Sequence, residues 1–209
     1  CLLVTFFGTA TAQNACFQST GDMAGFSLSV ETVATDVVAG LTTYRVYLNT
    51  PSTDDFVSAV IGDATDPLFL NTTTSFYQDA LGGTTAATIN PLFYGPFPDA
   101  QFDSWVTIGI DGPPDGAANQ GPVQLLESTP WTGSFEGGNS IALNSAYGDG
   151  WFALPTSSNG TPDSDGRVLL AQLTTAGHLS GQLYLQVLEG GVGGTDVRYT
   201  LTFGNACTD

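Results

Sequence analysis

The chain has 209 residues, of which 42% are hydrophobic and only 11% are charged, about half the charged fraction of an average soluble domain. Twenty acidic residues face three arginines, no lysine and one histidine, which gives a formal net charge of −17. Nucleic acids and anionic membranes bind basic surfaces, so we expect neither as a partner. No apolar run reaches the roughly 18 residues of a transmembrane helix, and the even spread of aliphatic and aromatic residues predicts a folded chain.

The first fifteen residues favour an exported protein. Residues 2–7 resemble the end of the apolar region of a signal peptide, and residues 10–12 (Ala-Thr-Ala) supply the small side chains of a cleavage site. Alternatively, Cys1 is a lipidated cysteine, or the segment is retained as a β-strand, because Leu-Val-Thr-Phe-Phe has strong strand composition. A retained strand can complete the sheet of a neighbouring subunit through the residues that share one face, Leu2, Val4 and Phe6.

Cys16 and Cys207 bracket the rest of the chain, residues 16–209, which we expect to form a single extracellular domain. In an exported chain these two cysteines are natural disulfide partners. Closing so long a loop removes on the order of 5 kcal/mol of unfolded-state entropy. Alternatively, the two thiols are unrelated, or Cys207 pairs beyond the end of this sequence.

The hydrophobic period along the chain is two rather than 3.6, which predicts strands. Clusters of Gly, Pro, Asp and Asn separate the strands, and helix-forming residues are scarce, so the only helical turn expected lies at residues 54–60. This pattern predicts an all-β fold, a β-sandwich or jelly roll. The clearest alternation predicts strands at residues 26–32, 44–48, 105–110, 167–173, 183–188 and 197–203.

Two halves of the chain, residues 26–112 and 120–206, share an order of short motifs. Each has a segment that ends in Thr-Pro, then a Leu-Phe-Leu-Asn or Ile-Ala-Leu-Asn stretch, then a segment that begins with Asp. This order predicts two related β units packed face to face and joined by a Gly/Pro-rich linker at residues 111–122. The alternative is that one strand simply resembles another.

A calcium site is predicted around the loop at residues 159–166. Calcium takes six to eight oxygen ligands, and closely spaced carboxylates followed by a glycine supply several of them in a sharp turn. A metal-free turn stabilised by Asp and Asn side chains explains the same residues. A second acidic loop contains Asp54, Asp55, Asp63 and Asp66, and the main candidate ligands are Asp149, Asn159, Asp163 and Asp165.

Loop aromatic residues offer a candidate carbohydrate-binding face. Trp131 and Trp151 lie in or beside loops, where exposed rings stack on sugars. Loop aromatics of β-sandwiches also close the ends of the core, which is the alternative for both residues. We expect Trp105, inside a strand, to belong to the core.

No complete catalytic motif is present, so we assign no catalytic residue and expect a protein without enzymatic activity. His178 is the single histidine, no Gly-x-Ser-x-Gly motif accompanies it, and a zinc site lacks ligands. Glycoside hydrolysis needs only two suitably spaced carboxylates, so a secreted hydrolase stays as the third alternative.

Residues 44–51, 103–109 and 167–175 resemble uncharacterised all-β domains of large secreted surface proteins of marine-type bacteria. The final Cys-Thr-Asp resembles the opening of short repeats that follow such domains. The resemblance covers residues 26–209 and implies an extracellular, non-catalytic module without a family active site to transfer.

We therefore expect a secreted or cell-surface structural or adhesive module, a subunit of an extracellular fibre or layer. Its partners would be further copies of itself or other surface proteins. The alternative is a calcium-assisted carbohydrate-binding module with glycans as partners.

Overall fold

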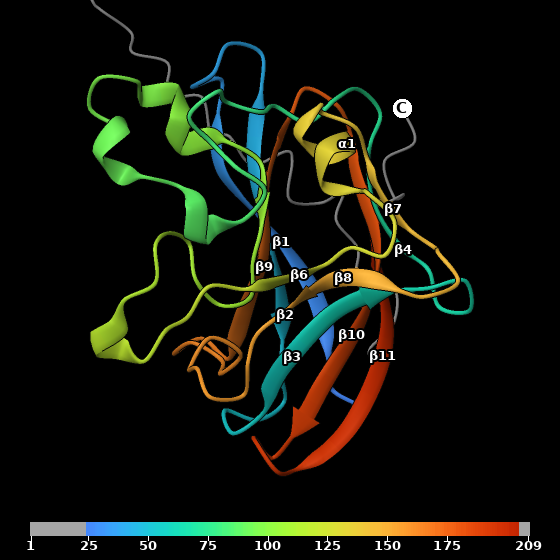
Figure 1. Cartoon of the computed structure of the whole chain (residues 1–209). Helices are drawn as coiled ribbons and strands as arrows, with labels where there is room; N and C mark the ends of the chain where they lie inside the picture. The colour runs from blue at the N-terminus through green and yellow to red at the C-terminus, as the bar shows by residue number, and fades with distance from the viewer. Residues whose placement is uncertain (1–23, 205–209) are drawn as a thin grey trace, which may run out of the picture.

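The structure, a computed structural model, describes residues 24–204 and contains two antiparallel β-sheets that face each other (Figure 1). This arrangement confirms the predicted β-sandwich. The smaller sheet has the strand order β1-β2-β9-β5. Its strands are β1 (Ser27–Thr35), β2 (Thr42–Asn49), β9 (Arg167–Thr175) and β5 (Trp105–Val106).

The larger sheet has seven strands and is built around the long strand β10 (Leu179–Glu189). One edge of β10 pairs with β3 (Phe56–Gly62) and with β4 (Leu68–Thr72), and the other edge pairs with β11 (Thr195–Phe203). Beyond β3 lie β8 (Asp149–Phe152) and β6 (Gln124–Leu126), and beyond β4 lies β7 (Ile141–Leu143). The turn after β9 carries the chain from the small sheet to the large one.

The two halves of the chain interleave within both sheets. In the small sheet β2 pairs with β9, and in the large sheet β3 pairs with β10. The packed layers are therefore the two sheets, and residues 26–112 and 120–206 do not form separate units that pack face to face. Strand pairing between distant segments decides the layers, whatever similarity the two halves share.

All six segments predicted from alternation contain a strand, with two local differences from the expected structure. Residues 105–110 are a strand only at β5, because Gly109 adopts a left-handed φ of 74° and the chain turns away. The helical turn expected at residues 54–60 is wrong, since Phe56–Gly62 forms β3 between β8 and β10. A short apolar run does not distinguish a helix from a buried strand by period alone.

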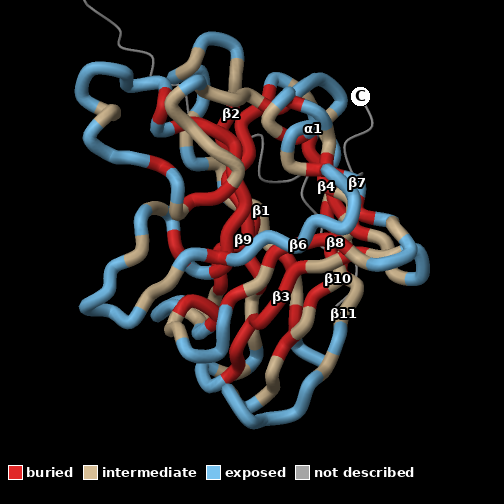
Figure 2. Tube along the Cα trace, viewed as in Figure 1, coloured by how far each residue is buried: buried red, intermediate tan, exposed pale blue. Residues whose placement is uncertain are grey.

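The main core lies between the sheets and is built from inward side chains of both. Figure 2 shows the buried residues of the two sheets in red. On β2, the inward residues Tyr44, Val46 and Leu48 are buried, and on β10 Leu183, Leu185 and Val187 alternate with more exposed neighbours. Burying each such side chain contributes about 1.5–3 kcal/mol. A short helix, α1 (Thr132–Glu136), adds Phe135 at the end of the core.

A second, smaller core lies on the outer face of the small sheet. Tyr47, Trp105 and Leu169 project outward from it and are covered by the segment after β4. This segment contains the three short 3-10 helices Ala86–Thr88, Pro91–Phe93 and Pro98–Phe102, and Figure 1 shows it in green beside the sandwich. This segment covers only part of the outer face of the small sheet, and the rest of that face is exposed.

Candidate functional site

Trp131 and Trp151, the predicted sugar-stacking residues, are both buried. Trp151 is 0% exposed and Trp131 is 5% exposed, and their ring centroids are 5.9 Å apart. Their indole nitrogens donate to backbone carbonyl oxygens, Trp131 to Leu126 and Trp151 to Thr107. Neither ring has a face open to a sugar, so the expectation of exposed rings is corrected, and the two residues close the core as the alternative reading held.

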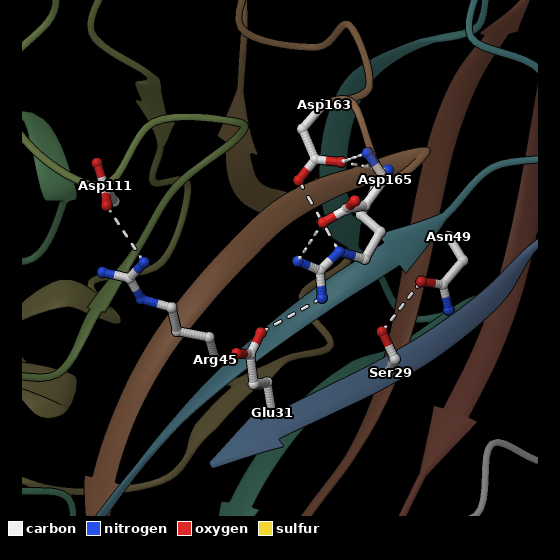
Figure 3. Close-up of polar contacts among 8 residues, drawn as sticks. Ser29, Glu31, Arg45, Asn49, Asp111, Asp163 and Asp165 are labelled. Atoms are coloured by element: carbon white, nitrogen blue, oxygen red, sulfur yellow. Dashed lines mark hydrogen bonds and ion pairs between the residues drawn. The ribbon is translucent and has the colours of Figure 1, made fainter. Parts of the chain in front are cut away.

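The predicted calcium ligands do not come together. Asp163 and Asp165 both lie against Arg167: the Arg167 Nη2 is 3.3 Å from Asp165 Oδ2, and its Nε is 3.8 Å from Asp163 Oδ2. The Arg167 Nη1 also lies 3.3 Å from Glu31 Oε2, and Figure 3 draws the three carboxylates, labelled Glu31, Asp163 and Asp165. Asp163 also accepts backbone hydrogen bonds from residues 165 and 167, which is the metal-free turn.

The other two candidate ligands have partners elsewhere. Asp149 accepts hydrogen bonds from the backbone N–H of Ser128 and of Thr129. The Asn159 side chain bonds both backbone groups of Gly121. Among residues 24–204, no three aspartate, glutamate, histidine or cysteine side chains form a group able to hold a metal ion. The four-residue site is therefore corrected, while calcium binding itself stays a prediction.

The remaining predicted sites, Cys16, Cys207, Leu2, Val4 and Phe6, lie outside the described residues. His178 is exposed at the turn between β9 and β10, where its backbone N–H donates to Thr73 Oγ1.

Two of the three arginines lie on the outer face of the small sheet, each beside an aromatic ring. Strand alternation places Arg45 and Arg167 opposite the inward residues of β2 and β9. The guanidinium of Arg167 lies 4.2 Å from the centroid of the Tyr47 ring, and that of Arg45 lies 5.8 Å from the Trp105 ring. Such contacts contribute about 0.5–2 kcal/mol each, more when water is excluded.

A cleft with a volume of about 430 Å³ opens beside Arg45. Its floor comes from all four strands of the small sheet, and its walls come from the 3-10 segment and from the loop after residue 109. We call it the Arg45 cleft and define it by Val33, Arg45, Tyr94, Trp105, Asp111 and Gln172.

Hydrogen bonds fix the guanidinium at the floor of this cleft. Arg45 Nη1 donates to Asp111 Oδ2 at 3.2 Å, as Figure 3 shows, and its Nε donates to Gln172 Oε1 at 3.2 Å. The Gln172 amide nitrogen in turn donates to the backbone oxygens of Gln101 and Asp103, at 3.0 Å each. The arginine is thus held from one side by the sheet and from the other by a loop.

No protein-family model, curated protein or solved structure matches this chain. Within residues 24–204, none of the helices has the length and apolar composition needed to cross a membrane.

The electrostatics of the Arg45 cleft keep its tyrosine protonated. Burial raises the pKa of Tyr94, and the nearby Asp111 carboxylate raises it further. Arg45 opposes this effect without cancelling it. At neutral pH the Tyr94 hydroxyl therefore both donates and accepts hydrogen bonds.

The most perturbed carboxyl group of the described chain, Asp103, lies outside the cleft. It is 0% exposed, and burial raises its pKa to about 7. Its Oδ1 accepts from the backbone N–H of Asp79 at 2.7 Å, and its Oδ2 accepts from that of Gly83 at 2.9 Å. A Cβ at Gly82 would lie 2.0 Å from Oδ2, so the loop fits only with glycine there. Asp103 anchors this loop to the sheet.

A second, smaller cleft of about 290 Å³ lies beside Trp131. Burial alone would raise the pKa of Asp149 there, but hydrogen bonds from Ser145, Thr129 and Ser128 hold it below its ordinary value. The Asp149 carboxylate is therefore ionised, and its hydrogen bonds order the loop before α1.

Sequence reasoning missed the Arg45 cleft. Two features of the sequence could have drawn attention to Arg45: arginine is rare in this chain, and the alternation along β2 predicts that Arg45 points outward because its neighbours point inward. Strand register places Arg45, Trp105 and Gln172 side by side. Tyr94 and Asp111 reach the cleft from segments outside the strands.

Proposed function

We propose that this chain is a non-catalytic structural or adhesive module of an extracellular surface. The observation that carries the proposal is the placement of its cations. All three arginines lie within strands, Arg45 in β2, Arg167 in β9 and Arg198 in β11, and the chain contains no lysine. Proteases of the trypsin type cut after exposed cations in extended loops, and the loops offer them none.

Hydrogen bonds from nearby backbone N–H groups to Asp and Asn side chains order several loops. Ordered loops support the proposal of a durable surface module. Asp63 accepts from the backbone N–H groups of residues 65 and 66, Asp115 accepts from that of residue 117, and Asn90 accepts from that of residue 92. Asp and Asn side chains stabilise turns in this way without a hydrophobic core. Much of the acidic composition thus serves loop structure.

The placement of Asp103 supports a non-catalytic role. A general acid needs both a raised pKa and contact with substrate. Asp103 has the raised pKa, but its side chain is sealed beneath the loop at residues 79–83 and is bonded to two backbone N–H groups. The carboxyl group best tuned for proton transfer at neutral pH is inaccessible.

Surface labelling tests the proposal directly. Antibodies raised against the folded domain should stain intact cells of the source organism, and trypsin added to those cells should leave the domain uncut while chymotrypsin releases fragments. Labelling that requires permeabilised cells would contradict an extracellular role. Rapid trypsin cleavage after Arg45 or Arg167 in the folded protein would contradict the argument from cation placement.

Assembly into a fibre or layer is a second candidate, favoured by two long strands at the borders of the sheets. Both β1 and β11 have nine residues, and among the named strands of residues 24–204 β1 pairs with β2 and β11 pairs with β10. Strands at the border of a sheet are places where a strand from another chain can add. If residues 2–7 supply that strand, deleting residues 1–12 should abolish large species in sedimentation velocity. Assembly that persists unchanged after the deletion would rule out this donor strand.

A further inference from the structure

We propose that the Arg45 cleft binds a neutral saccharide. The inference rests on the proposed function, because it names the ligand class of the adhesive module. The residues proposed to bind the saccharide lie on the outer face of the small sheet. They differ from Trp131 and Trp151, which are buried.

The cleft is preformed, which reduces the entropy lost when a ligand binds. Arg45 is held by Trp105, Gln172 and Asp111 at the distances given above. One wall begins with Asn90, whose side chain accepts from the backbone N–H of residue 92, and prolines at residues 91, 96 and 98 restrict its backbone. Its volume of about 430 Å³ falls within the range of about 300–1,000 Å³ typical of small-molecule sites.

The open polar atoms of the cleft include both donors and acceptors. Asp111 is 63% exposed and uses only Oδ2 toward Arg45, which leaves Oδ1 as an acceptor. The Tyr94 hydroxyl has no hydrogen-bond partner among residues 24–204, and the Arg45 guanidinium is held by Tyr47, Gln172 and Asp111. A hydroxyl group is at once a donor and an acceptor, so a polyhydroxylated ligand matches this mixed set.

Charge selects a neutral ligand over an ionic one. Within the cleft, the Arg45 cation is balanced by the Asp111 carboxylate, and the whole chain carries −17. An anionic ligand would have to displace Asp111 and would meet the negative field of the molecule. A cation would lie beside a fixed guanidinium. A neutral polar ligand avoids both penalties.

Apolar surface beside these polar groups suits the carbon–hydrogen faces of a sugar ring. Tyr94 is partly exposed, and Pro91, Pro113 and Val33 complete the lining. Aromatic and aliphatic surface flanked by a few convergent polar groups is the usual composition of a small-molecule site. A purely apolar ligand would bury the Arg45–Asp111 pair without replacing its water.

Binding to a glycan array tests the proposal, with the full chain as the probe. The array should carry neutral oligosaccharides (β-glucans, mannans, galactans, chitin fragments) and uronic-acid oligosaccharides of matched length. The strongest neutral ligand is then titrated by calorimetry against the wild type and two variants. Asp111→Asn removes the acceptor charge in the cleft. Asp165→Asn is the matched control, because Asp165 also pairs with an arginine on this face but does not line the cleft.

We expect neutral glycans to bind and uronic acids not to bind. Asp111→Asn should weaken binding about tenfold or more, the loss of one charge-assisted hydrogen bond, while Asp165→Asn should change it less than about twofold. Tyr94→Ala gives a second reading of the same cleft. Absence of binding to every neutral glycan, a preference for uronic acids, or equal effects of the two Asp variants would overturn the proposal. Surface labelling of intact cells would still stand in those cases, so failure of this inference is distinct from failure of the proposed function.

Discussion

Replacing Asp103 with Asn should change stability in opposite directions at low and at high pH. In the wild type, burial raises the pKa of Asp103 to about 7 from an ordinary value of 3.8. The folded state therefore binds this proton more tightly than the unfolded state does. The stability that the group contributes is present below pH 3.8 and is lost as the pH rises toward about 7.

The magnitude follows from the difference between the two pKa values. Each pH unit of separation is worth about 1.4 kcal/mol, so relative to low pH the titration of Asp103 lowers the free energy of unfolding by about 4 kcal/mol at pH 8 and by about 2 kcal/mol at pH 5, where the group is ionised only in the unfolded state. Asn carries no charge and avoids this term. It keeps one acceptor oxygen, so either Asp79 or Gly83 loses its backbone hydrogen bond, at a cost of about 1–3 kcal/mol.

Urea unfolding followed by tryptophan fluorescence measures both effects. We expect Asp103→Asn to be neutral or more stable than the wild type at pH 8, and neutral or less stable at pH 5. The difference in free energy of unfolding between the two proteins should change by about 2–3 kcal/mol across this interval. Repulsion within the acidic chain also weakens at low pH, but it acts on both proteins and cancels in the comparison. A difference that is the same at both pH values would refute the argument that Asp103 titrates inside the fold.

Three further predictions concern single residues of the small and large sheets. Arg167→Ala removes a stack on an aromatic ring and three exposed ion pairs, so it should lower Tm by about 2–4 °C. Its matched control, Arg198→Ala, should change Tm by less, because the nearest carboxylate oxygen is 4.0 Å away. The same Arg167→Ala variant frees the carboxylates of Glu31, Asp163 and Asp165 and should raise calcium affinity in calorimetry. No heat of binding in either protein would contradict the calcium prediction. Gly181→Ala should destabilise the fold by about 1–3 kcal/mol in urea unfolding, because the new Cβ would lie 2.4 Å from the Phe203 ring. An unchanged urea midpoint would mean that the Phe203 ring moves freely.

The fold class and the main strands follow from the sequence because alternation is a local signal. On β2, every second residue from Tyr44 to Leu48 is apolar and enters the core, as period-two patterning requires. β3 was not predicted, because Phe56–Gly62 is buried on both faces and lacks alternation. The arrangement of strands is not local: the pairing of β2 with β9 joins residues more than a hundred positions apart.

The candidate site was harder to predict, because its residues are ordinary when taken singly. Trp131 and Trp151 attracted attention as loop aromatics, yet both rings complete the core. Asp163 lies in a segment with the local sequence of a calcium loop. In the structure its carboxylate pairs with the Arg167 side chain and accepts the Arg167 backbone N–H. The arginine lies only four residues along the chain from Asp163, so the partner is local, but a local motif does not tell whether a carboxylate pairs with an arginine or ligates a metal ion.

The location of the Arg45 cleft follows from the way the sandwich divides its surfaces. The core between the sheets already buries the inward faces, so the outer face of the small sheet is available for other contacts. The segment after β4 covers part of that face and buries Tyr47, Trp105 and Leu169. Arg45 and Arg167 lie on this outer face, where the guanidinium group of each lies over an aromatic ring and pairs with exposed carboxylates. The sheet beneath the Arg45 cleft is rigid, and the polar groups that line the cleft are exposed. The proposed saccharide site requires both.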